Sequence, residues 1–336
     1  MIKDEIMVSV MMTAYNHGPY VLQALEGVAK QITNFNVQLI IHDDASPDNT
    51  ADLIRDFVAK HQEMDIETIF QTENQYSQKV RISDVFLYPL VRGKYVIVCE
   101  GDDYWTDEYK LQKQVDFLEA HPEYIGVSHN CVFVDENSNR IKPVYQIYGP
   151  YREHTCTLST LSHGFYPGQT ATLMLRTREY YDVRNEHLDE WYKIRENEDK
   201  RKALELLLNG NIYFMDDFMS AYRVVLTKGT SWSARQHNHN RYYSQFLGSI
   251  DCRKYSKKVY KRSFKNYHVT LKFIYYSFLK KRSENQEDVE AFNKIAAYCG
   301  GKFKLLLYSA FLAMWGLPGY IGGKLEYKRI FKPEEA

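Results

Sequence analysis

The stretch that decides the fold is IMVSVMMTAYNHGPYVLQALEGVAKQITNFNVQLIIHDD, which runs from Ile6 to Asp44. It begins with a short apolar run typical of a buried strand and continues into a segment from Pro19 to Gln31 that has the pattern of a helix. It ends in a second apolar run that stops at two aspartates. A strand, a helix and a second strand in this order predict a βαβ unit with parallel strands.

The same alternation continues through the first hundred residues. A second helix is expected after Asp44, with Ser46 as its N-cap and Pro47 at its first helical position. Next come a strand at 65–70, a helix at 82–91 and a strand at 94–100. Strands that alternate with helices of this length predict an α/β fold whose central sheet is mostly parallel and has helices on its faces.

Further elements follow, and the composition changes near residue 240. A helix is expected at 110–122, strands at 124–136, 168–177 and 212–225, and another helix at 196–211. We predict a domain at 1–240 and a helical, basic and aromatic C-terminal region at 241–336.

The bulk composition is that of an ordinary folded protein. Of 336 residues, 44% are apolar and 26% are charged, and the net charge is zero. The five cysteines are scattered without a CxxC pair, which favours reduced, buried thiols. The first residues, MIKDEIMVSV, make a poor signal peptide, and no apolar run reaches the length of a spanning helix.

A cluster of acids follows the strand expected at 94–100. In KYVIVCEGDDYW (Lys94–Trp105), the acids Glu100, Asp102 and Asp103 fall within four residues. Like charges this close repel each other, and hard oxygen donors of this kind suit Mg²⁺ or Mn²⁺. The cluster therefore indicates a divalent metal site, unless it is a solvated acidic turn or a helix N-cap.

A second acidic group ends the strand at about residue 44. In HDDASPDNT, Asp43 is expected to order the turn, because Asp and Asn readily form Asx-turns. Asp44 is expected to face a ligand, where its carboxylate could accept hydrogen bonds from a nucleobase or a ribose. Ligands of parallel sheets bind beyond the carboxyl ends of the strands, so we expect both acidic groups in one crevice.

Four ordered segments together resemble a family 2 glycosyltransferase of the GT-A, Rossmann-like fold. They are VSVMMTAYNHGPYVLQALEGVAKQ, LIIHDDASPDNTADLI, GKYVIVCEGDDYWTDEYKLQKQVDFLE and NEDKRKALELLLNG, and the resemblance covers roughly residues 6–230. It implies an inverting transferase that uses a nucleotide-diphosphate sugar and a divalent metal, and we expect the donor to be a UDP-sugar and the metal to be Mn²⁺ or Mg²⁺.

The resemblance also implies roles for individual residues. Thr13, Tyr15 and Asp44 match positions that hold the nucleoside, with Tyr15 against the base. Asp102 and Asp103 match the acidic motif that contacts ribose and metal, and Glu100 stands where many members have its leading aspartate.

Three further candidates are two acids at the start of the fourth motif and one arginine between the motifs. Asp199 in the ENED stretch matches the general base, with Glu198 as the second candidate. Arg81 follows TENQYSQK and is either a contact for the nucleotide or an ordinary surface arginine.

A basic tail completes the chain. Between Arg253 and Arg282 there are eleven Lys/Arg and no Asp/Glu, and the weakly charged run LLLYSAFLAMWGLPGYI follows. The segment is expected either to pack on the catalytic domain or, through residues 253–323, to contact an anionic membrane at the inner face of the cell membrane. The resemblance favours the membrane, because such enzymes often act on lipid-linked acceptors, and the lack of a nucleic-acid motif argues against nucleic acid.

We therefore expect a cytoplasmic, peripherally membrane-associated glycosyltransferase that transfers a hexosyl or N-acetylhexosaminyl group to a glycan or lipid-linked acceptor for polysaccharide assembly. Two alternatives stay open. A nucleotidyltransferase would need a glycine-rich loop with Arg or Lys after the first strand, which TAYNHGPY lacks. A non-catalytic sugar-nucleotide-binding or membrane scaffold protein would not need Asp199.

Overall fold

The computed structural model describes residues 5–142, 154–178, 181, 186–225 and 242–266, and isolated positions between 269 and 307. The chain divides into two compact units. The first combines residues 1–146, 168–182 and 213–234, and the second combines residues 147–167, 183–212 and 235–336. The predicted boundary near residue 240 lies outside the described residues.

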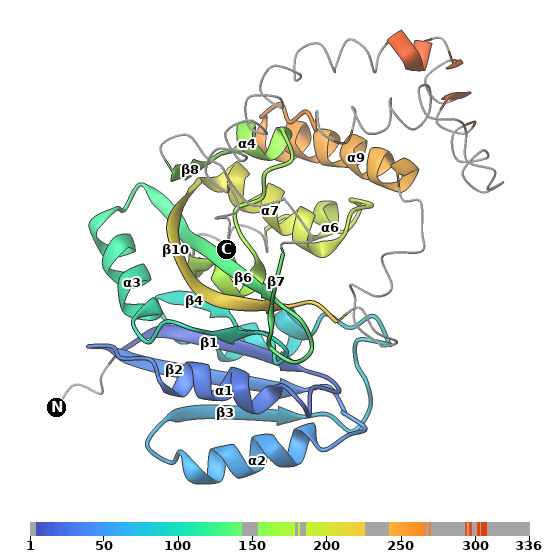
Figure 1. Cartoon of the computed structure of the whole chain (residues 1–336). Helices are drawn as coiled ribbons and strands as arrows, with labels where there is room; N and C mark the ends of the chain where they lie inside the picture. The colour runs from blue at the N-terminus through green and yellow to red at the C-terminus, as the bar shows by residue number, and fades with distance from the viewer. Residues whose placement is uncertain are drawn as a thin grey trace. The chain divides into compact units, whose positions relative to one another are not determined.

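The first unit is built on the predicted parallel sheet (Figure 1). Its first four long strands are β1 (Ile6–Ala14), β2 (Asn36–Asp43), β3 (Asp65–Phe70) and β4 (Tyr95–Val98). β1 pairs in parallel with both β2 and β4, and β2 pairs in parallel with β3. The carboxyl ends of β2 and β4 therefore lie on either side of β1, at one edge of the sheet.

The sheet continues beyond β4 with antiparallel pairs. The added strands are β9 (Met174–Arg176), β6 (Tyr124–Val134), β7 (Arg140–Ile141), β10 (Asn211–Arg223) and β5 (Tyr104–Trp105). Along the sheet the order is β3-β2-β1-β4-β9-β6-β10-β5, with β7 beside β6. β9 is antiparallel to both β4 and β6, and β5 is antiparallel to β10. This order brings the far end of β10 next to the acidic segment that follows β4.

Apolar faces of three helices complete the core of this unit. The helices are α1 (Val21–Ala29), α2 (Thr50–Lys60) and α3 (Lys110–Ala120). Val21, Ala24, Leu25 and Val28 recur at helical spacing and are all buried in one cluster with residues of β1, β2 and β4. The predicted α/β fold is confirmed, and its core fixes the strand ends that carry the acids.

The second unit is helical in its described part. It contains a short strand, β8 (Thr155–Cys156), and the helices α4 (Leu158–Ser162), α6 (Leu188–Trp191), α7 (Glu198–Asn209) and α9 (Tyr242–Tyr260). The fully buried Glu205 of α7 accepts hydrogen bonds from the hydroxyls of Tyr255 and Tyr260, so α7 and α9 are joined by polar contacts. Among the residues that the structure describes, no helix has the length and apolarity needed to cross a membrane.

Two local predictions are wrong. Ser46 does not cap α2 and Pro47 is not its first residue, because the helix begins at Thr50 with Asn49 as its N-cap. The Ser46 hydroxyl instead donates to Asp43 Oδ1 at 2.5 Å. The helix expected at 82–91 is a π-helical turn, Ser83–Leu87, followed by a 3₁₀ turn, Tyr88–Leu90. Pro89 lacks an N–H and cannot continue a regular helix. Cys99, Cys131, Cys156 and Cys252 are buried and form no disulfide among the described residues, as predicted, and Cys299 lies outside those residues.

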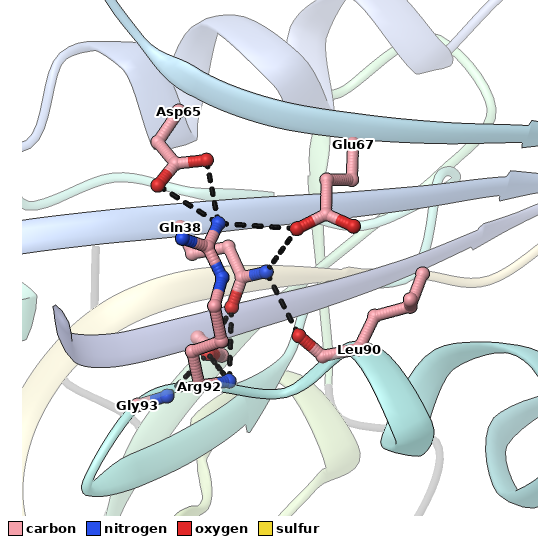
Figure 2. Close-up of polar contacts among 7 residues, drawn as sticks. Gln38, Asp65, Glu67, Leu90, Arg92 and Gly93 are labelled. Atoms are coloured by element: carbon pink, nitrogen blue, oxygen red, sulfur yellow. Dashed lines mark hydrogen bonds and ion pairs between the residues drawn. The ribbon is translucent and has the colours of Figure 1, made fainter.

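A polar network joins the strands at the sheet edge opposite the acids (Figure 2). The buried Gln38 side chain donates to Glu67 Oε1 at 2.7 Å and to the Leu90 carbonyl at 2.9 Å, and accepts from the Arg92 backbone N–H at 3.1 Å. The Arg92 guanidinium also pairs with Asp65 at 2.7 Å. The network satisfies buried polar groups at the amino ends of β2 and β3.

Gly93 allows the chain to pass close to β1 beside this network. A Cβ at residue 93 would lie 2.5 Å from the Ser9 backbone nitrogen and 2.7 Å from the Tyr95 carbonyl oxygen. Both contacts are with backbone atoms, which cannot move aside as the end of a side chain can. Only glycine, which has no Cβ, therefore fits at position 93.

We expect Gly93→Ala to lower the free energy of unfolding by about 2 kcal/mol or more, because the added methyl group overpacks the sheet edge. Urea denaturation of the full chain measures this change. The matched variant Lys94→Ala removes a half-exposed ion pair with Glu119 and a contact of the ammonium with the Tyr95 ring at 5.5 Å, and is expected to cost less than about 1 kcal/mol. Equal stability of the two variants would show that the close approach does not limit the fold.

Candidate active site

Three carboxylates gather where β4 ends. Glu100, Asp102 and Asp103 each offer an oxygen, and these oxygens lie within 4.8 Å of one another. The segment is held to the end of β1, because the Gly101 N–H donates to the Thr13 carbonyl at 2.9 Å. The residues predicted from KYVIVCEGDDYW are thus brought together, and oxygen donors at this spacing fit a divalent cation such as Mg²⁺ or Mn²⁺.

Asp103 is the buried member of the cluster, with 1% of its surface exposed. Its Oδ2 accepts a hydrogen bond from Gln169 Nε2 at 2.6 Å, and its Oδ1 accepts one from the Arg223 backbone N–H at 2.9 Å. Burial, then the charges of Asp102 and Glu100, raise the pKa of the Asp103 carboxyl well above its ordinary value. A bound cation would oppose that shift, because it favours the ionised form.

Asp102 is more accessible and lies beside a histidine that sequence reasoning missed. His17 Nε2 is 3.8 Å from Asp102 Oδ2. The ring lies against Gly101, where a Cβ would be 2.9 Å from His17 Nδ1. The only signal in the sequence was the position of His17 in TAYNHGPY, the loop that follows the first strand, because loops at strand carboxyl ends carry ligand contacts.

Asp44 and Asp43 occupy the end of β2, on the other side of β1. Asp43 Oδ2 accepts from the Ser46 N–H at 3.1 Å, which agrees with its expected role in the turn. Asp44 is buried, and its two carboxylate oxygens accept from the backbone N–H groups of Gln75 and Tyr76 at 2.8 and 3.0 Å. Asp44 therefore orders the loop after β3, and its contact with a nucleoside stays a prediction.

The loop after β1 directs three successive backbone N–H groups at side chains of the protein. Asn16 donates to Ser46 Oγ at 3.0 Å, His17 to Thr50 Oγ1 at 2.9 Å and Gly18 to Asp48 Oδ2 at 2.9 Å. Burial acts to raise the pKa of Asp48, but the hydrogen bonds from Thr50 and Gly18 outweigh it and the pKa lies below its ordinary value. These N–H groups are thus bound within the chain.

Three more predicted residues lie along the same edge of the first unit. Thr13 is at the end of β1, and the Tyr15 side chain, two residues further on, is 39% exposed. Arg81 pairs with Asp84 at 2.8 Å, in the segment after β3. An exposed ring beyond a strand end is available for stacking, while the ion pair gives Arg81 a structural role that does not require a ligand.

Asp199 and Glu198 lie in the first turn of α7, in the second unit. The helix is capped by Asn197, whose side chain accepts from the Lys200 N–H at 3.1 Å. The Asp199 side chain reaches solvent, yet removal of water by the surrounding protein raises the pKa of its carboxyl, against the opposing charges of Lys202 and Lys200. A raised pKa brings a carboxylate closer to the value that suits a general base.

Glu196 precedes α7 and is a further acid that sequence reasoning missed. Its side chain is 7% exposed, and its Oε2 lies 2.9 Å from Lys200 Nζ. Burial raises the pKa of Glu196, although the Lys200 charge acts in the opposite direction. Because this carboxylate is paired, it supports the start of α7 and leaves Asp199 and Glu198 as the candidate bases.

The match to a family model covers residues 9–229 and is described as glycosyl transferase family 2. The match includes both acidic segments and Asp199. The chain belongs to this family.

Two individual proteins are similar to part of the chain, and one of them is a named glycosyltransferase. The chain is 40% identical over 174 residues to the uncharacterized protein Rv1520 of Mycobacterium tuberculosis, covering 52% of this chain and 48% of that protein. It is 26% identical over 129 residues to WfaP of Escherichia coli, a UDP-Glc:alpha-D-GlcNAc-diphosphoundecaprenol beta-1,3-glucosyltransferase, covering 38% of this chain and 48% of WfaP. The matched region spans about half the length of these relatives.

Solved structures show the same fold. S. aureus TarS residues 1–349, in a complex with UDP, superimposes with a TM-score of 0.58 at 15% identity and covers 94% of this chain and 89% of that one. The fold is therefore GT-A.

A buried lysine lies close behind the acidic segment. Lys110, the first residue of α3, is fully buried, donates to Gln114 Oε1 at 2.7 Å and has its Nζ 4.3 Å from the centre of the Trp105 ring. Burial lowers the pKa of the Lys110 ammonium well below its ordinary value, although the charge of Asp107 opposes this shift. The folded chain therefore binds this proton more weakly than the unfolded chain does.

The stability of the protein should rise with pH because of Lys110. Between its folded pKa and the unfolded value of about 10.4, the unfolded chain holds more protons, so stability increases through that window. We expect the unfolding free energy of the wild type, relative to Lys110→Met, to increase from pH 7 towards pH 10 in urea denaturation.

Lys113→Met is the matched control. Asp107 raises the pKa of Lys113, so this group stays protonated in both states over the same range and its variant should show no such slope. A stability difference between the wild type and Lys110→Met that does not change with pH would contradict the prediction.

Proposed function

We propose that this protein is an inverting glycosyltransferase that transfers a hexosyl or N-acetylhexosaminyl group from a nucleotide-diphosphate sugar, with UDP as the nucleotide. The observation that carries the proposal is the cluster of Glu100, Asp102 and Asp103 at the end of β4, with oxygens within 4.8 Å, in a chain of glycosyltransferase family 2. Such a cluster is half of a metal site, and the diphosphate of the donor would contribute the remaining oxygens.

Mn²⁺ or Mg²⁺ is the cofactor that these residues would hold. When bound, the ion would neutralise charge on the departing diphosphate. Asp102 and Asp103 are the proposed ligands and Glu100 the third. Asp103 is held by two hydrogen bonds, so its carboxylate keeps one orientation, and the more exposed Asp102 completes the site on the solvent side.

The nucleoside is assigned to the loops after β1 and β3. The exposed Tyr15 ring would stack on the base, Thr13 would border the site, and Asp44 would act through the loop that it orders at Gln75 and Tyr76. Arg81 is assigned to the same side as a contact for the base or diphosphate. Support for UDP comes from similar proteins, since WfaP is a transferase named for UDP-Glc and TarS, which shares the fold, was solved in complex with UDP.

Asp199 is the proposed general base, and Glu198 is the second candidate. The base takes the proton from the acceptor hydroxyl as that oxygen attacks the anomeric carbon, and the diphosphate leaves from the opposite face with inversion. The raised pKa of Asp199 suits proton abstraction near neutral pH.

The acceptor is proposed to be a glycan or a lipid-linked saccharide at the inner face of the cell membrane, which would be contacted through residues 253–323. The supports are the basic and aromatic sequence of that segment and the lipid diphosphate in the name of WfaP. Electrostatic attraction of lysines and arginines to anionic lipid is a sequence-independent interaction.

A nucleotidyltransferase is disfavoured by the loop after β1. A triphosphate site needs free backbone N–H groups there, but those of Asn16, His17 and Gly18 are bound by Ser46, Thr50 and Asp48. A non-catalytic sugar-nucleotide-binding or scaffold protein is separated from an enzyme by the Asp199 variant described below.

If Asp102 is a metal ligand, Asp102→Asn should weaken the metal-dependent binding of the donor. We expect wild-type protein to bind a UDP-sugar in the presence of Mn²⁺, measured by isothermal titration calorimetry, and Asp102→Asn to bind it at least about 10-fold more weakly. Without metal, the variant should be no less stable than the wild type, because one of three repelling charges is gone.

Asp52→Asn is the matched control for this experiment, because Asp52 is an exposed residue of α2 paired with Arg55. It should bind donor as the wild type does. Equal donor binding by Asp102→Asn and the wild type would show that the acidic cluster is not the metal site.

If Asp199 is the general base, its replacement should lower turnover and leave donor binding unchanged. Asp199→Asn is expected to lower kcat by about 10²–10⁴-fold, with the donor dissociation constant unchanged, in an assay of sugar transfer or donor hydrolysis. The wild-type rate should rise with pH through the raised pKa of Asp199, since only the ionised form accepts a proton.

Glu198→Gln is the comparison, since Glu198 is adjacent in the same helical turn. If Glu198→Gln alone abolishes turnover, the base is Glu198. If both variants keep wild-type turnover, neither carboxylate is the base. If the wild type binds donor but shows no turnover, the scaffold alternative gains support.

A further inference from the structure

Arg223, the last residue of β10, is a buried arginine with 3% of its surface exposed. It contacts the acidic segment in two ways. Its backbone N–H donates to Asp103 Oδ1 at 2.9 Å, and its side-chain Nε donates to the Asp102 carbonyl oxygen at 2.9 Å. One residue from a distant strand therefore holds both the carboxylate of Asp103 and the backbone of Asp102.

The other end of the guanidinium is held by two elements that do not belong to the acidic segment. Nη1 donates to the carbonyls of Asp135 and Glu136 at 3.0 and 3.3 Å, in the turn between β6 and β7. Nη2 donates to Gln23 Oε1 of α1 at 2.7 Å. The guanidinium also lies 4.4 Å from the centre of the Tyr20 ring. Three parts of the first unit thus converge on one cation.

The turn that receives Nη1 is itself ordered. Asp135 Oδ1 accepts from the backbone N–H groups of Asn137 and Asn139 at 2.9 and 2.8 Å. The Ser138 hydroxyl accepts from Arg223 Nη1 at 3.1 Å and donates to Gln23 Oε1 at 3.2 Å. The turn therefore presents its carbonyls at fixed positions, so the guanidinium has little freedom to move.

Arginine suits this place because its guanidinium is planar, stays charged and has donors fixed in a fork. An ammonium group could not reach the Asp102 carbonyl, the turn and Gln23 at once. The segment 100–103 follows a strand of only four residues, so contacts from outside the segment decide where its carboxylates point. Residues that orient metal ligands in this way change metal affinity when they are replaced.

We propose that Arg223 is the positioning residue of the metal and donor site, and that it fixes Asp102 and Asp103 against the β6–β7 turn and α1. Arg223 acts through the carboxylates and touches neither donor nor metal in this role. The inference rests on the proposed function, because it assigns the orientation of the carboxylates that are proposed to bind the ion.

Arg223→Lys in the full chain tests the proposal. The variant keeps a positive charge and the backbone N–H that donates to Asp103, but it loses the fixed set of guanidinium donors. We expect the apparent dissociation constants for Mn²⁺ and for a UDP-sugar to rise about 10-fold, measured by titration calorimetry and by the electron paramagnetic resonance signal of free Mn²⁺. The Mn²⁺ concentration that gives half-maximal turnover should rise in parallel.

Arg176→Lys is the matched control. Arg176 of β9 also donates to backbone carbonyls, those of Tyr124 at 2.8 Å and Leu118 at 2.5 Å, but it pairs with the amino end of β4, away from the acids. It should lose stability in the same way while keeping the Mn²⁺ and donor constants of the wild type. An equal change in both variants would reduce Arg223 to a structural role and overturn the proposal.

Gln23→Met is the second variant, and it covers the case in which Arg223→Lys does not fold. Gln23 is exposed on α1 and contacts the far end of the guanidinium. A rise in the Mn²⁺ constant, smaller than that of Arg223→Lys, supports the proposal. Wild-type constants in Gln23→Met and in any folded Arg223 variant overturn it. If the wild type itself shows no metal-dependent donor binding, the proposed function fails first, and the inference fails with it.

Discussion

The site depends on keeping the buried carboxylate of Asp103 next to two other acids. An ionised carboxylate loses the stabilisation of water on burial, and Asp102 and Glu100 add repulsion, so the pKa of Asp103 is raised. The fold compensates with donors from two distant segments, Gln169 and Arg223. The order of the strands in the sheet makes this possible, because it brings the end of β10 next to the segment that follows β4.

The two edges of the sheet carry different kinds of polar contact. At the amino ends, Gln38, Arg92, Asp65 and Glu67 satisfy one another, and their contacts serve structure (Figure 2). At the carboxyl ends, three carboxylates lie together with oxygens within 4.8 Å of one another, and His17 Nε2 lies 3.8 Å from Asp102 Oδ2. Like charges concentrated at one edge are a physical sign of a binding edge, because their mutual repulsion costs stability that a bound cation would relieve.

The family match and the chemistry of the acidic cluster support different parts of the proposed function. The match over residues 9–229 places the chain among glycosyltransferases, whereas the acidic cluster gives the reason for a divalent ion. The first loop adds an independent argument, because its N–H groups are already bound by side chains and leave no cradle for a triphosphate.

The sequence by itself determined the α/β class, the strands that carry the acids and the grouping of Glu100, Asp102 and Asp103, because strand period and local spacing act over a few residues. It could not show that Asp44 orders the loop at Gln75 and Tyr76, that His17 lies beside Asp102, or that Ser46 binds Asp43 instead of capping α2. Only the tertiary structure decided these contacts and the place of Arg223. Hydrogen bonds between residues 120 positions apart, such as that from Arg223 to Asp103, arise from strand order, and strand order is a property of the whole packed sheet.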